Sequence, residues 1–597
     1  MRDAYCCNPD ANTRRHALTF SALAQLVIVM STAPAYAAAS GTATSTITGE
    51  LVGILMLSVP LAFVMSVIAL GLYLRAVKRS MLRRTTPRGP TTAPIPLASV
   101  SPANALRLVF LTGAEALSDD AESFVAGATH NLWRLAGVYA AGGVAFALVM
   151  TIAYLAANGI GFLPFRTLFL FVSYAWPIVL TTGLIACVSR REWLAIVVAY
   201  IAIFAAVTAP SLNAQFTPLV ALVTWAINNG PATVLVLTFL ARPIRAVGPM
   251  MMAMMYAAVT GISLAVHTIG ATDERMAWAA GVGSAAGLDG HQTFLAVMLT
   301  GFVMLGVGGW FLMRDIGRRY QAQQISDQSL MLDSLWLMFA INHGIDLVFA
   351  GPAWFLAAIA AFGAYKAVTL ALFAVFHRDD DVAPVRLLLL RVFSLGKRSE
   401  RLFSAFSKPW RQAGTMRLIA GPDLATSTIE PHEFLGFLTG QIDRHFIDSP
   451  ATLERRIGET VPHRDRDGRY RIGDFFCHDD TWKPVLRKLA ASSDAIMMDL
   501  RGFSQKHKGC AFEIQELINH VPLGRIVLIA DRTTDKTFLR ETLERSWQML
   551  GPSSPNYADP EPCVRIVPLA SDVDTRTLLR VVAAAAHATP VKPVTTP

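Results

Sequence analysis

Long apolar stretches occupy much of the first 376 residues of this 597-residue chain and constrain its fold more than any other feature. A helix needs about 20 mostly apolar residues to cross the hydrocarbon core of a bilayer. Such stretches lie at 51–74, 135–156, 167–188, 193–212, 216–240, 248–270, 290–313, 332–350 and 353–376. Only 16% of the residues are charged, whereas soluble domains carry about a quarter. The chain is therefore predicted to contain a polytopic α-helical membrane domain.

Basic residues follow every second apolar stretch. They are Arg75, Lys78, Arg79, Arg83 and Arg84 after the first stretch, Arg190 and Arg191 after the third, Arg242 and Arg245 after the fifth, Arg314, Arg318 and Arg319 after the seventh, and His377 and Arg378 after the last. The intervening loops are poor in Lys and Arg. Because loops rich in these residues stay in the cytoplasm, the pattern predicts a multi-pass protein of the bacterial inner (plasma) membrane with a cytoplasmic C-terminal domain.

The N-terminus has the pattern of an export signal at 1–37. Arg14, Arg15 and His16 precede an apolar stretch, and Ala35-Tyr36-Ala37 has the small-x-small form of a cleavage site. An uncleaved first helix is the alternative, and both readings leave the C-terminus in the cytoplasm. Residues 38–131 are then the first span plus a cytoplasmic loop, and 132–376 hold eight further spans. Within that loop "ALRLVFLTGAEAL" predicts an amphipathic helix that lies on the membrane or covers the C-terminal domain.

Two charged residues lie at similar depths within the last two predicted spans. At 1.5 Å of rise per residue, Asp333 is about 25 Å from the outer turn at Gly351 and Lys366 about 20 Å, whereas Asp346 is only about 6 Å from it. Asp333 and Lys366 are therefore predicted to pair. A structural ion pair near the cytoplasmic face is one reading, and part of a proton or ion pathway is the other.

Residues 377–590 change in character to short apolar runs that alternate with amphipathic stretches. Five runs ("LLLLRVF", "MRLIAG", "AIMMDL", "RIVLIAD" and "CVRIVPL") read as strands with helices between them. This alternation predicts a cytoplasmic α/β domain with a five-stranded parallel sheet covered on both faces. From His377 onward there are 31 Lys and Arg against 28 Asp and Glu, a balance that argues against a nucleic-acid partner. No Cys and His spacing indicates a metal site.

In parallel sheets, ligands bind at the carboxyl ends of the strands. Candidate ligand-binding residues by this rule are Ser394, Lys397 and Arg398 after the first strand, Asp423 after the second, and Asp499 and Arg501 after the third. The first group forms an anion-binding turn or an exposed basic loop. His478, beside Asp479 and Asp480, is a candidate general base, and helix capping is the other explanation for these acids.

Several of these segments resemble a Toll/interleukin-1 receptor (TIR) domain. "RVFS" is similar to the first strand of that family, "PVLRKLAASSDAIMMDL" to a helix and the third strand, and "GCAFEIQEL" to the Cys-x-x-Glu start of the next helix. The chain also resembles uncharacterised bacterial multi-pass membrane proteins. The resemblance implies a flavodoxin/TIR-like fold. In TIR domains that cleave NAD the glutamate of this motif is catalytic, which implies a catalytic role for Glu513, with NAD as a substrate and no bound cofactor.

Three functions fit these observations. The first is a membrane protein with a cytoplasmic TIR-like signalling or interaction module, whose partners are the lipid bilayer and either a second copy of the chain or a cytoplasmic protein. The second is a membrane-gated NAD hydrolase. The third is a transporter with a regulatory tail, in which internal repeats or broken helices would be expected.

Overall fold

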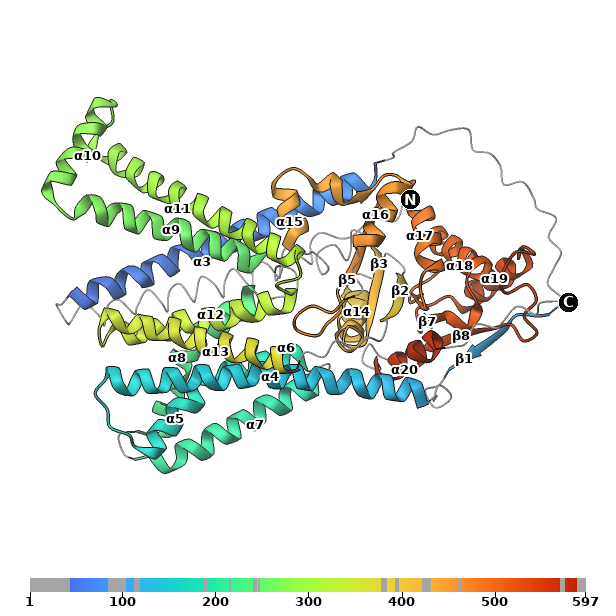
Figure 1. Cartoon of the computed structure of the whole chain (residues 1–597), viewed down its shortest axis with the longest axis horizontal. Coiled ribbons are helices and arrows are strands. Elements are labelled where there is room, and N and C mark those ends of the chain that lie inside the picture. Colours follow the sequence, from blue (N-terminus) through green and yellow to red (C-terminus); the bar gives the residue numbers. More distant parts are fainter. Residues whose placement is uncertain are drawn as a thin grey trace.

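The computed structural model describes most of the chain. The described residues are 43–83, 104–111, 119–186, 190–213, 216–239, 244, 247–376, 384–391, 397–420, 431–459, 463–569 and 575–587. The predicted signal at 1–37 lies outside them. Helices gather at one end of the molecule and a sheet with its covering helices at the other (Figure 1).

The first two thirds of the chain form a helical bundle. Its helices are α3 (Ala43–Met81), α4 (Asp119–Ala157), α5 (Pro164–Tyr174), α6 (Trp176–Ile185), α7 (Arg190–Thr208), α8 (Pro218–Phe239), α9 (Gly248–Gly270), α10 (Asp273–Ala285), α11 (Gly290–Gln321), α12 (Asp327–Val348) and α13 (Phe355–Phe376). The 3-10 turns η2 (Ala209–Ser211) and η3 (Pro352–Trp354) lie between them.

Among the described residues, eight segments are long and apolar enough to cross a membrane, with α5 and α6 together making one of them. They correspond to eight of the nine predicted spans. The stretch 332–350 forms α12, which is 22 residues long but too polar to reach the same hydropathy. Its polar residues lie in a helix that packs against α3, α4, α6, α8 and α13. An interior position explains why α12 can be helical and central without being apolar throughout.

The last third alternates strands and helices. Its elements are β2 (Val385–Arg391), α14 (Lys397–Trp410), β3 (Gly414–Ala420), α15 (Pro431–Leu438), η4 (Ile442–His445), β4 (Phe446–Ile447), α16 (Pro450–Glu459), β5 (Ile472–Cys477), α17 (Trp482–Ala491), β6 (Ala495–Asp499), α18 (Lys508–His520), η5 (Leu523–Arg525), β7 (Ile526–Ala530), α19 (Lys536–Gln548), β8 (Cys563–Pro568) and α20 (Thr575–Ala586).

The sheet is parallel and has the order β1-β8-β7-β6-β2-β3-β5-β4. All five runs predicted as strands form β2, β3, β6, β7 and β8, and these five alone follow the flavodoxin-like order 2-1-3-4-5. The predicted count of five was wrong, because three more strands extend the two edges. Strands β5 and β4 lie on the edge toward the bundle, and β1 lies on the far edge (Figure 1).

Strand β1 (Arg107–Phe110) comes from the loop between α3 and α4 and pairs with β8 over four residues. The amphipathic helix predicted across "ALRLVFLTGAEAL" is therefore wrong for these residues. A short Leu-Val-Phe run suits a half-covered edge strand as well as a helix, and the open edge of β8 decides between the two.

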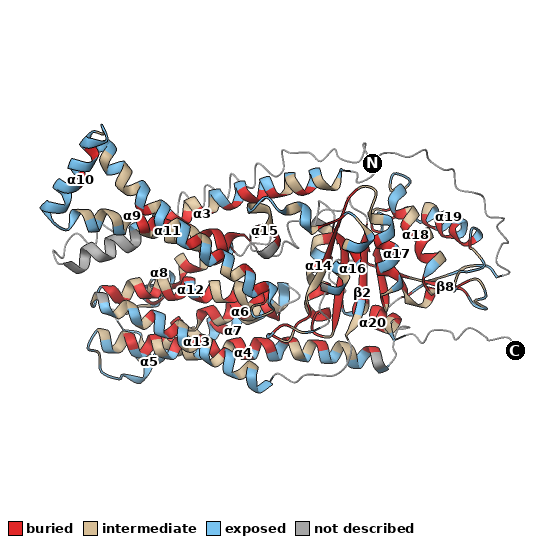
Figure 2. Cartoon of the chain, turned by 45° about the horizontal axis from the view of Figure 1, so that its top comes forward, coloured by how far each residue is buried: buried red, intermediate tan, exposed pale blue. Residues whose placement is uncertain are grey.

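Both faces of the sheet are covered by apolar side chains from the helices. Leu388, Ile496 and Leu528 point to the face packed by α17, α18 and α19. Their neighbours Leu387, Met497 and Val527 point to the opposite face, where α14 and α20 pack. This alternation is the two-residue period of a strand, and Figure 2 shows the buried residues running through the strands.

The bundle and the sheet share part of one apolar core. The cluster on the α14 side of the sheet continues into Tyr73 and Val77 of α3 and Met250 of α9. Helix α4, 39 residues and so about 58 Å long at helical rise, exceeds the roughly 30 Å hydrocarbon core. Its first turns reach the sheet, where the Glu122 and Arg580 side chains lie 3.5 Å apart.

Candidate functional site at the junction of bundle and sheet

The carboxyl ends of β2 and β6, where the strand order reverses, bring together several of the predicted site residues. The side chains of Asp499 and Arg501 pair at 2.8 Å and are 2% and 1% exposed. Ser399 donates a hydrogen bond to Asp499 (3.3 Å), and Arg501 donates one to the backbone oxygen of Arg398 (3.2 Å). These groups therefore bind one another and form a closed, buried cluster.

The other candidate residues predicted at this edge do not join the Asp499–Arg501 cluster through their side chains in the described structure. Arg398 pairs with Asp531. Burial disfavours the charged form of that carboxyl, but hydrogen bonds from Thr533, followed by the Arg398 guanidinium, outweigh burial and lower its pKa. Lys397 begins α14. Ser394 and Asp423 lie outside the described residues.

Glu513, on α18, is buried with 4% of its surface exposed. Burial raises its pKa to about 8, and the Arg391 guanidinium at the end of β2 opposes that shift. Its Oε2 atom has no hydrogen-bond partner within the described part of the chain. Glu516, one turn on, pairs instead with Arg487 at 2.5 Å, which lowers its pKa. The two carboxyl groups of this helix thus have opposite environments.

In the bundle, the structure brings the predicted pair together. Lys366 Nζ of α13 lies 2.5 Å from Asp333 Oδ2 of α12. Tyr139 of α4 interacts electrostatically with Asp333 and also with Asp327, Asp467 and Arg469. The pair is therefore close to a second set of charged side chains, which lies at the end of α12 that faces the sheet.

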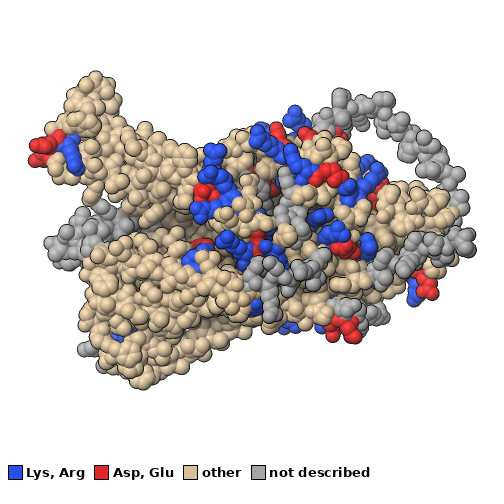
Figure 3. Space-filling view, in the orientation of Figure 1, with Lys and Arg blue, Asp and Glu red and all other residues tan. Residues whose placement is uncertain are grey.

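That second group, here called the junction cluster, joins the first turn of α12 to the sheet domain. Its members are Ser326 and Asp327 from the bundle and Arg411, Asp465, Asp467, Arg469 and Arg471 from the domain. Arg411 donates two hydrogen bonds to the Asp327 carboxylate (3.2 and 3.3 Å), and Arg469 donates a third (3.0 Å). Figure 3 shows the charged side chains of the molecule gathered over this part and the sheet, with few over the bundle.

Asp467 links the same arginine to the N-cap of α12. Arg469 donates to Asp467 at 2.9 and 3.1 Å, and the Ser326 hydroxyl donates to it at 2.5 Å. Ser326 in turn accepts a hydrogen bond from the backbone of Ser329 and so caps the helix. A carboxylate at this position is also favoured by the partial positive charge of the helix N-terminus.

Arg471 extends the cluster to the end of α11. It donates two hydrogen bonds to Asp465 (2.9 and 3.0 Å) and one to the backbone oxygen of Tyr320 (2.7 Å), and its guanidinium stacks over the Tyr320 ring. A turn at 465–469 presents these groups, and Gly468 takes a positive φ of 79° there, a conformation that favours glycine.

Most members of the junction cluster are buried, so their charges depend on one another; Asp327 is half-buried, with 41% of its side chain exposed. Burial raises the pKa of Asp465 to about 7, with Arg471 opposing the shift and Asp467 adding to it. Burial also disfavours the charged form of Arg469, but Asp467 and Asp327 outweigh it and raise its pKa above the usual value. Asp467 and Arg469 are 5% and 7% exposed, and either one alone would be a buried, uncompensated charge.

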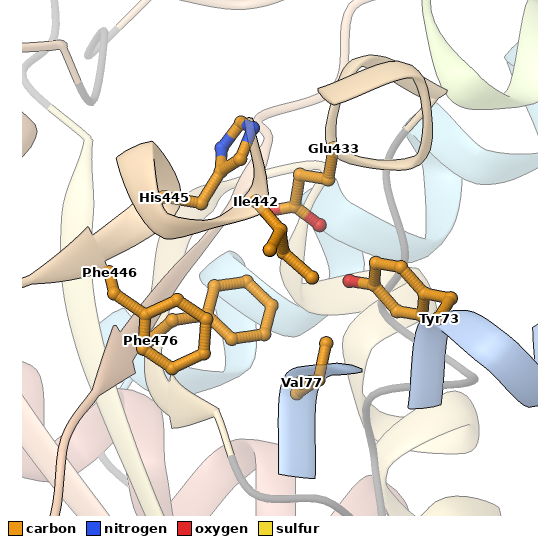
Figure 4. A pocket seen from close by; sticks show the side chains of 7 residues that line it. All are labelled: Tyr73, Val77, Glu433, Ile442, His445, Phe446 and Phe476. Atoms are coloured by element: carbon orange, nitrogen blue, oxygen red, sulfur yellow. The ribbon is translucent and has the colours of Figure 1, made fainter. Parts of the chain in front are cut away.

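A second contact joins the end of α3 to the β5 edge of the sheet. His478 Nδ1 lies 2.6 Å from the backbone oxygen of Ser80, and the Asp479 amide donates to that of Arg83 (3.2 Å). Beside it is a small hollow, shown in Figure 4 and lined by Tyr73, Val77, Glu433, Ile442, His445, Phe446 and Phe476. Burial, with a contribution from Arg456, lowers the pKa of His445 to about 4. The His445 side chain is therefore uncharged near neutral pH.

Sequence reasoning did not identify the junction cluster. Its domain half lies in "RDRDGRYR" (464–471), a dense alternation of arginine and aspartate within a polar insertion. That density is a usable signal, because so many charges in eight residues need partners. The partner Asp327 reads in the sequence only as an acid at a helix start, and Arg411, which joins Asp327 to the domain, lies outside the insertion.

Comparison of the chain with protein-family models, with curated proteins and with solved structures gives no match.

Proposed function

We propose that the chain is a multi-pass inner-membrane protein whose helical bundle controls a cytoplasmic, TIR-like signalling or interaction domain. The observation that carries this proposal is the junction cluster, in which Asp327 of α12 supplies charge to Arg411 and Arg469 of the domain at 3.0 to 3.3 Å. A helix that moves in the bundle must take these partners with it or leave buried charges unpaired. The bilayer and either a second copy or a cytoplasmic protein are the proposed partners.

Two chain connections and one apolar cluster support coupling between the two parts. Helix α4 runs from the bundle to the sheet, the α3–α4 loop contributes β1 to the far sheet edge, and one apolar cluster crosses the boundary. A freely tethered tail would need none of these. A movement of the bundle helices can therefore displace the strands through these connections.

The test is to disturb the bundle and measure the sheet. Lys366→Met leaves Asp333 unpaired in α12, and we expect amide hydrogen exchange in β5 (Ile472–Cys477) to change in the full chain held in a bilayer. Adding Arg411→Met and Arg469→Met should abolish that response while the exchange of α12 still changes. The double variant Asp333→Asn/Lys366→Met, which removes both charges, is the matched control and should respond less than Lys366→Met alone. Unchanged exchange in β5 in Lys366→Met would refute the coupling.

The proposed orientation has a separate test. A C-terminal reporter fusion at Pro597 should be inactive as alkaline phosphatase and active as a cytoplasmic reporter, because the alternation of Lys- and Arg-rich loops along the sequence puts the C-terminus in the cytoplasm. Phosphatase activity at that position would overturn the cytoplasmic assignment.

The two other functions stay as predictions. NAD cleavage is tested by nicotinamide release from the full chain, with Glu513→Gln expected to lower it by at least about a hundredfold and Glu516→Gln as the control. The closed Asp499–Arg501 cluster does not favour this reading. For the transporter, α5 and α6 together make one candidate span that is interrupted at Ala175, as a broken helix would be, whereas α10 is a separate 13-residue helix.

A further inference from the structure

His343, in the half of α12 away from the sheet, is a buried imidazole inside a ring of aromatic side chains. It is 0% exposed, and its ring centroid lies 4.8 Å from that of Tyr174, 5.9 Å from Phe339 and 6.3 Å from Phe146. Neither ring nitrogen has a hydrogen-bond partner among the residues that the structure describes. Leaving such a buried polar group unpaired is unfavourable, so His343 is not explained by stability.

Asp346 lies three residues further along the same helix, about one turn closer to the far end of the bundle. Asp346 is partly exposed and interacts electrostatically with Tyr174 of α5. Tyr154 of α4 also interacts with Tyr174. Helix α8 faces this level with the backbone oxygen of Asn228, which accepts a hydrogen bond from Asn342 (2.6 Å). On α13 the atoms nearest to Gly344 belong to the apolar Ala358 and Phe355. Helices α6 and α8 carry no ionisable side chain, and neither does α3 between Leu57 and Leu72. Tyr174 and Tyr154 are therefore the titratable groups beside His343 and Asp346 on the described helices packed around them.

The backbone next to His343 is tightly packed against α13. A Cβ atom on the adjacent Gly344 would lie 2.9 Å from Ala358 and from the Phe355 ring. On the sheet side, Phe146 packs against Trp336 (5.1 Å), and Trp336 stacks on Tyr365 (4.9 Å). This aromatic layer separates His343 from the Asp333–Lys366 pair. The aromatic layer thus closes the site toward the sheet. Asp346, the partly exposed residue of the site, lies toward the end of the bundle away from the sheet.

We propose that His343, Asp346 and Tyr174 form a proton-binding site that is filled from the aqueous phase at the far face of the membrane. With Asp346 ionised and His343 neutral the site carries one negative charge, and one proton from water neutralises it without any other exchange. Resting on the coupling proposed above, this proton is the stimulus, because α12 carries the site near one end and Asp327 of the junction cluster at the other. The aromatic layer makes the site a sensor rather than a conduction path.

The test uses the full chain in liposomes with the sheet domain in a lumen held near pH 7.5 and the outer solution changed from about pH 7.5 to about 5.5, the range of histidine and carboxyl switches. Hydrogen exchange, normalised to the intrinsic rate, is followed in 339–348 and in 463–477. We expect both segments of the wild type to change by at least about threefold and Asp346→Asn and His343→Gln to lose the response. Asp289→Asn is the control, because Asp289 is an exposed helix cap at the same end and asparagine also caps.

The outcomes separate the two proposals. A wild type that does not respond in 339–348, or an Asp346→Asn variant that responds as the wild type does, overturns the proton site. A response in 339–348 with none in 463–477 supports the site and refutes the coupling. A proton flux into the lumen that is lost in Asp346→Asn, measured with an enclosed pH dye, overturns the sensor in favour of a conduction path.

Discussion

Two clusters of arginine and aspartate differ in what holds them together. At the carboxyl edge of the sheet, Asp499 at the end of β6 and Arg501 just after it are two residues apart and bind each other. In the junction cluster, Asp327 binds Arg411 and Arg469, which are 84 and 142 positions away. The contact between Asp499 and Arg501 lies within the sheet domain, whereas the junction cluster forms only when the bundle and the domain are docked. The same chemistry therefore closes a loop in one place and links two regions in the other.

Loss of Arg469 should have the largest effect. Arg469→Met removes the partner of the buried Asp467 and one partner of Asp327, and breaking a buried pair from one side costs about 3–5 kcal/mol. We expect this loss in urea titrations of the detergent-solubilised full chain, together with faster hydrogen exchange at the start of α12. Arg466→Met, in the same segment but exposed, should stay within about 0.5 kcal/mol of the wild type. Similar losses in both variants would mean that the cluster has no special role.

Arg501→Met sharpens the comparison because it breaks the local cluster in the same way. It leaves Asp499 buried, so the free energy of unfolding should fall by about 3 kcal/mol. Exchange in α12 should stay as in the wild type, since Asp499 and the backbone oxygen of Arg398, to which Arg501 donates, both belong to the sheet domain. If α12 responds to Arg501→Met as it does to Arg469→Met, the distinction between a local and a linking cluster fails.

The pH dependence of stability should follow Glu513. Its pKa is about 8 in the folded chain against an ordinary value of 4.5, so the folded state binds more protons between these values and stability falls as pH rises through that window. The slope from one such group is at most about 1.4 kcal/mol per pH unit. Glu513→Gln should flatten the curve and stabilise the chain at pH 8 relative to wild type.

Glu516→Gln is the matched control for this titration. The pKa of Glu516 is lowered by Arg487, so its contribution has the opposite sign and is lost as pH falls. A Glu513→Gln variant with the wild-type slope above pH 6 would show that this carboxyl does not titrate there.

The smallest effect is expected at the contact between the end of α3 and η4 of the sheet domain. The Arg83 and Asp443 side chains are 68% and 65% exposed and 3.8 Å apart. Exposed pairs contribute about 0–1 kcal/mol and are screened by salt, so Arg83→Ala should change stability by less than about 0.5 kcal/mol in thermal melts at physiological salt. A larger loss would place the main link at α3 instead of α12.

Much of the architecture was predictable because it depends on local patterns. Apolar length predicts the helices of the bundle, and the five strands at the centre of the sheet are short apolar runs. Depth along the helices was enough to place Lys366 beside Asp333, because helical rise is constant. The edge strand β1 was mistaken for a helix, since the Leu108-Val109-Phe110 run has no periodicity that separates the two states.

By itself, therefore, the sequence determined which segments are helices and which are central strands, because the length of an apolar run is a local property that each segment carries alone. Only the tertiary structure decided that Asp499 and Arg501 close on each other, that Glu513 is buried beside Arg391, and that Asp327 binds Arg411 and Arg469. These contacts depend on which surfaces meet once the whole core is packed. A charge shows in the sequence that it needs a partner, but only packing across 84 to 142 positions of chain shows which partner it has.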